Sequence, residues 1–401
     1  MTETAKSQAK ARTAIIIGGG VAGPTAALAL RRAGIEAVVY EAHRPGSGTA
    51  GGPLSIASNG RAALALVGAD HLFDGIATPT PRFIIQSYTG KVLGEMNDLP
   101  DLRPRLTLPR GTLTDALRDH AESEGVEFVH GRRFVDAVDT GHSVIAQFDD
   151  HTTAEADVLV GCDGIHSVVR SRIDPGAPEP RYTGLVSFGG YVDGTGLSGT
   201  GGAQHFVFGR EAFFGYQVEG GECGWFANLP IKRAAPGELR RTDFATWMRR
   251  LRAAFARDRG PALEILDRVT PEAFAPAHRL EDLPRLPRWS KGRMALVGDA
   301  AHATSPSSGQ GASLAAESAV EIARCLRDLT PEDAFRAYRH HRRERVERVI
   351  AAAARTNRAK AAGPVAARFR DLAMPFFLEK FNTPEKTAWQ YAYSIDWEAA
   401  A

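Results

Sequence analysis

A glycine-rich run near the N-terminus has the composition and spacing of a turn that binds the phosphates of a dinucleotide. Residues Gly18 to Gly23 read Gly-Gly-Gly-Val-Ala-Gly, which fits the pattern Gly-x-Gly-x-x-Gly. The β-branched run 13–17 before it predicts a buried strand, and 25–33 after it predicts a helix. In such a turn Gly20 lets the main chain approach a pyrophosphate, and the free N–H groups of the helix face the negative charge.

Neighbouring small and acidic residues strengthen this prediction. Gly18 allows the tight bend, while Gly23 and Ala27 let the helix pack close to the strand. Glu41 ends a second predicted strand about twenty residues after the turn, where a carboxylate accepts hydrogen bonds from ribose hydroxyls and repels a 2′-phosphate. We therefore expect FAD or NAD, rather than NADP, at this site. The residues predicted to bind it are Gly18, Gly20, Ala22, Gly23 and Glu41.

Two later turns also follow predicted buried strands, and each carries an aspartate. The first reads Gly-Cys-Asp-Gly-Ile-His-Ser and contains Asp163. The second reads Gly-Asp-Ala-Ala-His, contains Asp299, and leads on to Pro306 and then to Gly309-Gln310-Gly311. Taken alone, Asp299 is explained by a helix cap. We interpret His302 as a structural histidine rather than a catalytic acid.

Composition and charge exclude several other classes of protein. The net charge of +2 is too small to indicate nucleic acid or an anionic membrane. The three cysteines, Cys162, Cys223 and Cys325, are far apart, which argues against a disulfide scaffold or a metal site and favours the cytoplasm. The uncharged stretch 14–30 is too short and too rich in glycine for a membrane span. The arginine-rich run 339–348 alternates with glutamates and predicts a solvated helix face.

The remaining patterns place parallel-sheet elements in at least two blocks, with an antiparallel region between them. Further buried strands are predicted at 37–40, 126–129, 158–160 and 294–297, and helices at 113–123, 244–257 and 312–327. Alternating, glycine- and phenylalanine-rich sequence marks 182–230 as an antiparallel sheet, and a small meander is predicted over 134–154. The predicted fold is α/β: a discontinuous Rossmann-like domain with an inserted antiparallel-sheet substrate domain and C-terminal helices. The expected boundaries are 13–75, 101–180 and 276–360 for the first, 76–100 and 181–275 for the second, and 361–401 for the C-terminal helical segment.

The second and third turns resemble those of the class A flavoprotein aromatic monooxygenases, typified by para-hydroxybenzoate hydroxylase. The pattern Gly-Asp-Ala-Ala-His-x-x-x-Pro-x-x-Gly-x-Gly beginning at Gly298 is matched in full. Salicylate-hydroxylase-like and tetracycline-inactivating monooxygenases are the most similar branches. The resemblance covers residues 13 to 350 and departs at Cys162, where the family commonly has alanine.

The resemblance implies how the chain holds FAD. Asp163 and Asp299 are expected to contact the cofactor, and Arg110, in Arg-Gly-Thr-Leu, is expected to reach its ribityl–phosphate region. Gly309, Gln310 and Gly311 open a helix whose N–H groups would face the flavin ring, and Pro306 would lie where oxygen reacts. We expect Pro306, Gly309 and Gly311 to form the catalytic ring environment without a protein nucleophile. The glycine loop 46–53 would be a wall beside the flavin.

The same resemblance implies the reaction. NADPH or NADH would bind transiently and reduce the flavin, O2 would add to form the C4a-hydroperoxide, and one oxygen atom would pass to an aromatic or polycyclic small molecule. Such chemistry serves natural-product biosynthesis or the degradation of antibiotics and aromatics. We expect a cytoplasmic monomer or homodimer that binds no nucleic acid and no metal.

An aromatic-rich stretch, 204–228, is the predicted substrate wall. For any single aromatic side chain in it, a place in the core of the sheet remains the simpler explanation. The candidate substrate residues are Gln204, Arg210, Phe214, Tyr216, Trp225 and Asn228, with His205 as a possible base.

Several alternatives stay open at this stage. The flavin reaction is not distinguished from epoxidation or Baeyer–Villiger insertion. A halogenase is disfavoured because Trp225-Phe226-Ala227-Asn228-Leu229-Pro230 lacks a second tryptophan. A non-enzymatic flavin-binding partner protein would carry the same glycine turns, and a plain NAD dehydrogenase would carry the first of them.

Overall fold

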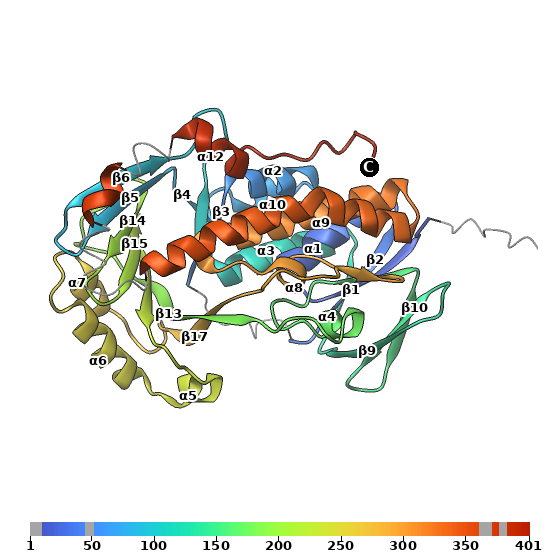
Figure 1. Cartoon of the computed structure of the whole chain (residues 1–401), viewed down its shortest axis with the longest axis horizontal. Coiled ribbons are helices and arrows are strands. Elements are labelled where there is room, and N and C mark those ends of the chain that lie inside the picture. The colour runs from blue at the N-terminus through green and yellow to red at the C-terminus, as the bar shows by residue number, and fades with distance from the viewer. Residues whose placement is uncertain (1–9, 45–51, 361–370, 377–382) are drawn as a thin grey trace, which may run out of the picture.

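The computed structural model describes residues 10–44, 52–360, 371–376 and 383–401. Residues 46–51 of the loop predicted as a flavin-side wall, 46–53, lie outside the described residues. The molecule is elongated, with one large sheet toward each end, and the long helix α10 (Pro331–Lys360) runs along its length (Figure 1).

A six-stranded sheet carries the three predicted turns. Its strands follow the order β18-β19-β12-β1-β2-β8, and all are parallel except β18 at one edge. The bounds are β1 Thr13–Ile17, β2 Glu36–Glu41, β8 Glu127–His130, β12 Val158–Gly161, β18 Ser290–Lys291 and β19 Met294–Leu296. The apolar runs of β1, β12 and β19 are buried without alternation, as expected of central strands that are covered on both faces. The strands that precede the three turns, β1, β12 and β19, are immediate neighbours, so the turns leave the sheet at one edge.

Two helices cover this sheet and connect it to the rest of the chain. Helix α1 (Ala22–Arg32) follows the first turn, and α9 (Gly311–Asp328) follows the third. Both are almost wholly buried, because alanine, serine and glycine let them pack closely against each other and the sheet. The predicted helix 113–123 is longer than expected, since α3 (Arg110–Ser123) begins at Arg110.

The antiparallel region forms a separate seven-stranded sheet in the order β17-β13-β16-β15-β14-β5-β6. The bounds are β5 Arg82–Ser87, β6 Val92–Asn97, β13 Arg181–Asp193, β14 Ala203–Phe208, β15 Phe213–Glu219, β16 Glu222–Pro230 and β17 Ala275–Asp282. The predicted antiparallel character of 182–230 is confirmed. One pairing is different in kind, because β14 and β5 run parallel.

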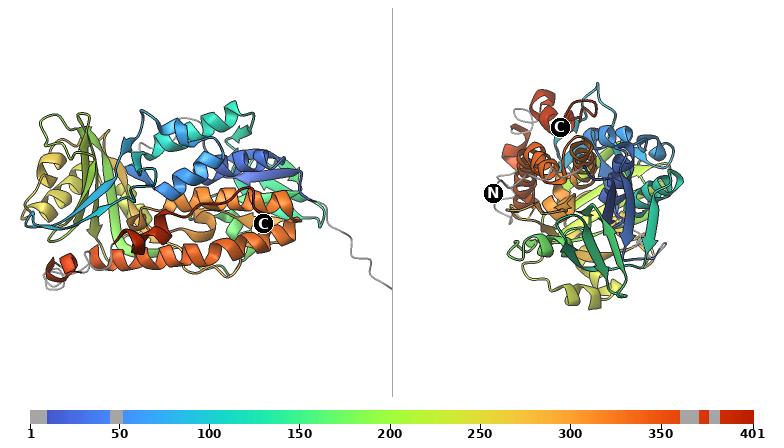
Figure 2. Two further views of the ribbon diagram at one scale, coloured as in Figure 1. Left: turned by 90° about the horizontal axis from the view of Figure 1, so that it is seen from above. Right: turned by 90° about the vertical axis from the view of Figure 1, so that its right-hand side faces the viewer.

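The two faces of this sheet have different partners. Helices α6 (Phe244–Phe255) and α7 (Ala262–Leu266) cover the face that points away from the rest of the molecule (Figure 2, yellow). Phe214, Tyr216 and Trp225 point to these helices and belong to their shared core. Successive side chains of a strand alternate between faces, so Phe213 and Phe226 point inward, toward the other sheet.

The remaining described elements are short. The predicted meander is confirmed as β9 Phe134–Asp139, β10 Val144–Phe148 and β11 Thr153–Ala156. The others are β3 Pro53–Ile56, α2 Ser58–Leu66, η1 Asp70–Phe73, β4 Thr78–Pro79, β7 Leu106–Pro109, α4 Val168–Ile173, α5 Pro236–Arg241, α8 Asp299–His302, η2 Pro306–Ser308 and α12 Pro384–Tyr391. None of the helices within the described ranges is long and apolar enough to cross a bilayer.

Replacing Trp225 by alanine is expected to destabilise the fold. The side chain is fully buried between the antiparallel sheet and its helices, so Trp225→Ala should lower the free energy of unfolding by about 3–5 kcal/mol. Val138→Ala, on an exposed side chain, should change it by less than about 0.5 kcal/mol. Urea unfolding curves of both variants test this, and a Trp225→Ala protein as stable as wild type would contradict the placement.

Candidate functional site

The first glycine turn is compressed against two parts of the backbone. Gly18 has φ +104°, and a Cβ there would lie 2.5 Å from the carbonyl oxygen of Cys162. A Cβ on Gly23 would lie 1.9 Å from the carbonyl oxygen of Gly18. Neither contact is possible for a real side chain, so both positions require glycine. Because these backbone contacts are so close, the first turn of α1 lies against the end of β1 and beside the second motif.

The outer side of the same turn is open. A Cβ on Gly20 would have no heavy atom within 4 Å. Beside it, the Glu41 carboxylate accepts hydrogen bonds from the Gly19 N–H at 2.6 Å and the His43 N–H at 2.8 Å. The carboxylate is thereby held at the edge of the turn, where the sequence predicts the ribose hydroxyls to bind.

Asp163, in the second motif, has a clear local role. Its carboxylate accepts hydrogen bonds from the Ser167 hydroxyl at 2.6 Å and from the N–H groups of Val168 and Val169 at 2.7 and 3.0 Å. Burial raises the pKa of this carboxyl, and these hydrogen bonds oppose the rise. Asp163 therefore stabilises the start of α4, while its predicted contact with a cofactor stays a prediction.

The third motif meets the first at Gly298. This residue has φ +64°, and a Cβ there would lie 3.0 Å from the Cβ of Ala22 and 3.3 Å from the Cβ of Ala315. Gly298 thus sits between the first turns of α1 and α9. The next residue, Asp299, begins α8. The sequence-distant motifs are brought together at this crossing.

Arg110 and Asp299 are close enough to interact. Burial raises the pKa of the Asp299 carboxyl above its usual range, and the positive charge of Arg110 opposes that rise. Arg110 is the first residue of α3 and its side chain is exposed. The predicted pair of ribityl- and phosphate-binding residues is therefore brought together in space.

The Pro306–Gly311 segment presents exposed main chain beside buried polar groups. Pro306 and Gly309 are exposed, Gly309 has φ +59°, and a Cβ on Gly309 would meet nothing within 4 Å. Gln310 is buried, and Gly311 begins α9. Between Thr304 and Gln310, three buried polar atoms lack a hydrogen-bond partner among the described residues: Thr304 Oγ1, Ser307 Oγ and Gln310 Nε2.

These features fit a dinucleotide with a polar ring system. Open space at Gly20 and Gly309 leaves room at both ends of the crossing for a ligand to approach main-chain N–H groups. The unpartnered polar atoms beside Pro306 have hydrogen-bonding capacity that a ligand would satisfy. His302, by contrast, is buried, hydrogen-bonds to the Ser318 hydroxyl at 2.8 Å, and has its pKa lowered to about 3 by burial, as expected of a structural histidine.

A buried charged network supports the start of α9. Asn59 donates to Gln310 Oε1 at 2.8 Å and to Glu317 at 2.6 Å. Glu317 also pairs with Arg342 at 2.5 Å and Arg345 at 2.7 Å. Arg342 is fully buried, so the prediction of a solvated face for 339–348 is wrong for this side of α10. The alternation of arginine and glutamate within the segment did not indicate the burial of Arg342, because its partner, Glu317, comes from another helix.

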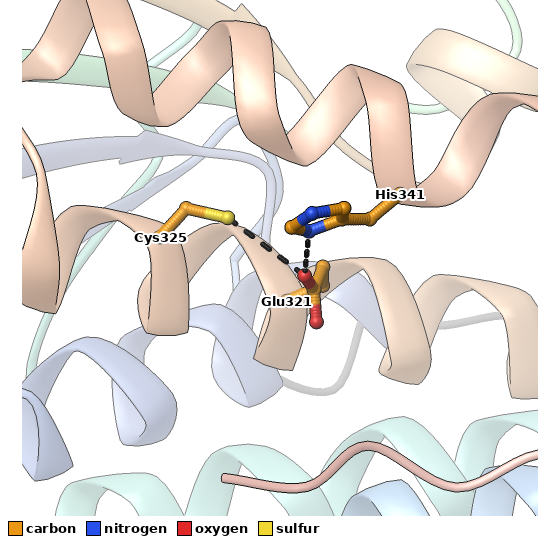
Figure 3. Close-up of side chains that lie close together, drawn as sticks. All are labelled: Glu321, Cys325 and His341. Atoms are coloured by element: carbon orange, nitrogen blue, oxygen red, sulfur yellow. Dashed lines mark hydrogen bonds and ion pairs between the residues drawn. The ribbon is translucent and has the colours of Figure 1, made fainter. Parts of the chain in front are cut away.

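A second cluster joins α9 to α10 nearby. Glu321, Cys325 and His341 place potential metal-ligand atoms within 4.8 Å of one another (Figure 3). His341 Nδ1 lies 2.6 Å from a Glu321 oxygen, but Arg324 also binds both oxygens of that carboxylate. The guanidinium already supplies the positive charge that a metal ion would bring. We therefore interpret the cluster as an interhelical tie.

The predicted substrate residues do not lie together. Phe214, Tyr216 and Trp225 face α6 and α7, as described above, and the Tyr216 hydroxyl lies 3.2 Å from His205 Nδ1. Arg210 is exposed, and its main-chain N–H donates to Asp258. Gln204 and Asn228 are buried and lie on the inward face by strand alternation. A substrate role for each of the six stays a prediction, and the geometry favours the inward face.

Three residues outside the list of candidate substrate residues lie on or against that inward face: Phe213 and Phe226, which belong to the predicted wall 204–228, and Lys360. Phe213 and Phe226 alternate with the predicted Phe214 and Trp225, and both strands carry aromatics on both faces, so sequence alone did not separate them. Lys360, at the end of α10, donates to Asn228 Oδ1 at 3.0 Å. It lies more than a hundred residues away in the sequence and belongs to no motif.

Comparisons with known proteins agree with this geometry. Residues 11–189 and 280–353 match the family described as FAD binding domain. The chain is 29% identical over 323 residues to an aurachin C monooxygenase/isomerase of Stigmatella aurantiaca, covering 78% of this chain and 80% of the relative. It is 28% identical over 360 residues to a salicylate hydroxylase of Pseudomonas putida, covering 79% and 77%.

A solved structure has a similar fold. Klebsiella pneumoniae HpxO, crystallised with FAD and uric acid, superposes with a TM-score of 0.83 at 24% identity, over 94% of this chain and 97% of HpxO.

Removing the charge of Glu317 is expected to destabilise the chain. Burial alone would raise the pKa of Glu317, but Arg342 and Arg345 outweigh it and hold the pKa below its usual value. The stabilisation is therefore present above the unfolded carboxyl's pKa and is lost as pH falls through the lower folded value. Glu317→Ala should cost about 3–5 kcal/mol at pH 7, because it leaves Arg342 buried without its partner.

The exposed Glu332 provides a control on the same pair of helices. Glu332→Ala should cost less than about 1 kcal/mol, since its ion pair with Arg336 is in solvent. Urea midpoints of both variants at neutral and acidic pH measure the difference. Equal midpoints for Glu317→Ala and wild type at pH 7 would show that the network does not stabilise the fold.

A side chain at Gly20 is expected to block FAD. Gly20→Val should weaken FAD binding by at least about tenfold, because the added atoms occupy the open side of the turn without disturbing a packed one. Gly199→Ala, also at an open position with ordinary φ but in the antiparallel region, should retain FAD. The absorbance of flavin released from equal amounts of protein measures both. Full flavin content in Gly20→Val would overturn the placement of the pyrophosphate.

Proposed function

Because the chain belongs to the FAD-binding family of class A flavoprotein monooxygenases and is itself an FAD-dependent monooxygenase, we propose that it hydroxylates an aromatic or polycyclic small molecule with NADPH or NADH and O2. The observation that carries the proposal is the convergence of the three glycine turns at Gly298, opposite an inward-facing aromatic sheet surface. Salicylate and uric acid, named with the relatives above, are flat ring compounds, which suits such a surface.

In this proposal different residues of the chain bind different parts of FAD. The main chain at Gly20 and the first turn of α1 bind the pyrophosphate, and Glu41 binds the ribose of adenosine. Arg110 and Asp299 bind the ribityl–phosphate link. The N-terminus of α9, at Gly309 to Gly311, faces the flavin ring and favours negative charge on it. When bound, FAD supplies the electron transfer from the nicotinamide and the activation of oxygen.

The protein's own part in the reaction is positioning and shielding. Pro306 has no N–H and leaves one fewer donor at the ring face. The inward aromatic side chains Phe213 and Phe226 orient the substrate and exclude water, which protects a reactive oxygen species from decay. Residues 13–75, 101–180 and 276–360 form the cofactor-binding part in this proposal, and 76–100 and 181–275 form the substrate-binding part.

The proposal also includes a compartment, a class of pathway and an oligomeric state. All three cysteines are buried free thiols, which suits the reducing cytoplasm. The substrate belongs to natural-product biosynthesis or to the degradation of an aromatic or an antibiotic. The chain acts as a monomer or homodimer.

The purified yellow protein is expected to oxidise NADPH or NADH faster when a suitable aromatic is present. Oxygen consumption and mass spectrometry of the products, over a panel of phenols, benzoates, indoles and polyketides, measure this. The expected product is heavier than its substrate by one oxygen atom, and the Gly20→Val protein is the control for flavin dependence. Nicotinamide oxidation that no compound accelerates, with no oxygenated product, would favour a flavin-binding partner protein instead.

A further inference from the structure

The last turns of α10 connect the segment 305–311, which is proposed to lie at the flavin edge, to the inward face of the antiparallel sheet. Asn357 Oδ1 accepts a hydrogen bond from the Ser305 hydroxyl at 3.1 Å, and Ser305 directly precedes Pro306. Lys360 follows three residues later, on the same side of the helix, and reaches Asn228 on β16. One helix face therefore contacts both surfaces between which the substrate is proposed to lie.

The surroundings of the Lys360 ammonium are mainly aromatic. Its Nζ lies 3.9 Å from the centre of the Phe213 ring and 5.8 Å from that of Phe226. Asn228 Oδ1 accepts from it at 3.0 Å. The amide nitrogen of Asn228 donates to Ser187 Oγ and to the Ala227 carbonyl, so its oxygen is the end left for the lysine. The aromatic faces favour a cation at this place.

Among the described residues, this ammonium has no carboxylate as an ion-pair partner. It has three N–H donors, and Asn228 is the one hydrogen-bond acceptor that the described part of the chain offers it. No charged group of the described residues contributes to the pKa shift of Lys360, whose one cause is burial. Burial lowers the pKa of Lys360 to about 7. Holding a lysine there without an anion costs free energy, which an anionic ligand would recover.

We propose that Lys360 is a specificity-determining residue that selects aromatic substrates carrying an anionic oxygen, as a carboxylate, phenolate or enolate. The inference rests on the proposed function and deepens it. The anion pairs with the ammonium, and the ring of the substrate packs beside Phe213 and Phe226. The tie through Asn357 to Ser305 sets the distance from this anion site to the flavin edge. Lys360 binds and orients the substrate and takes no part in oxygen transfer.

Matched pairs of ligands test the charge directly. The probes are benzoate, 4-hydroxybenzoate and 2-naphthoate, each against its uncharged primary amide. Binding to the FAD-loaded protein at pH 6.5 is followed by the change in flavin absorbance, which needs no turnover. Wild type is expected to prefer each carboxylate that binds by about tenfold or more over its amide. Lys360→Met should abolish the preference, Lys360→Arg should keep it, and Lys291→Met, on an exposed lysine of β18, should leave it unchanged.

The pH dependence separates charge from packing. The groups that face Lys360 from β15 and β16 are Phe213, Phe226 and Asn228, none of which titrates. Carboxylate binding by wild type should therefore weaken as pH rises through about 7, where Lys360 loses its proton, whereas binding by Lys360→Arg should not. A merely structural lysine would instead change carboxylate and amide binding alike, without this difference.

Three results overturn the inference: carboxylates that bind wild type no better than amides, a panel in which none binds, or a Lys360→Met protein that keeps the preference. These are distinct from failure of the proposed function. If the protein binds carboxylates through Lys360 but never yields an oxygenated product, the anion site is supported and the hydroxylase function is contradicted. If the protein oxygenates carboxylate and amide with equal KM, the hydroxylase function is supported and the anion site is contradicted.

Discussion

The crossing at Gly298 is the constraint on which the rest of the structure depends. At this point the backbone between β19 and α8 passes within van der Waals reach of the first turns of both α1 and α9. A larger residue at Gly298, or at Gly18 and Gly23 in the adjoining turn, would force these elements apart. Because they are close, the partial positive charges of two helix N-termini act on one region of space. A long anionic cofactor needs this arrangement, and the parallel order of β19, β12 and β1 provides it.

Around that crossing, polar groups are buried at some cost in free energy. Glu317, Arg342 and Arg345 form a charged group inside the protein, and Asn59 connects it to Gln310, just before α9. Buried ion pairs contribute little net stability compared with apolar packing, but they are costly to break. The network therefore holds the start of α9 in one position relative to α2 and α10. The same helix α10 then reaches the antiparallel sheet, so it connects the parts proposed to bind cofactor and substrate.

Sequence reasoning identified the elements with strong local signals. The glycine turns after β1, β12 and β19 were predictable because each glycine pattern has a backbone requirement that few other arrangements share. The strands β2 and β8, the meander and helices α6 and α9 followed from hydrophobic patterns. The parallel pairing of β5 with β14 was not predictable, because it joins strands more than a hundred residues apart and leaves no local pattern.

The face of the antiparallel sheet that forms the substrate wall could also not be predicted from the sequence. Phe213, Phe214, Trp225 and Phe226 occupy adjacent positions on strands that are covered on both faces, so alternation could not decide which face the helices α6 and α7 take. Arg342, which is fully buried, and Lys360, which is partly buried, lie in one long charged helix, and residues on other helices and strands cover them. Contacts with distant segments of the chain determine whether such residues are buried. A periodic pattern within one segment carries no information about those contacts.

One FAD is expected to span the crossing from Glu41 to Gly309. Titration of FAD into the flavin-depleted chain, followed by flavin fluorescence and by the protein-to-flavin ratio after gel filtration, tests it most directly. Saturation is expected at one FAD per chain, with the flavin retained through the column. A chain that takes up no FAD, or that saturates at any other ratio, would contradict it.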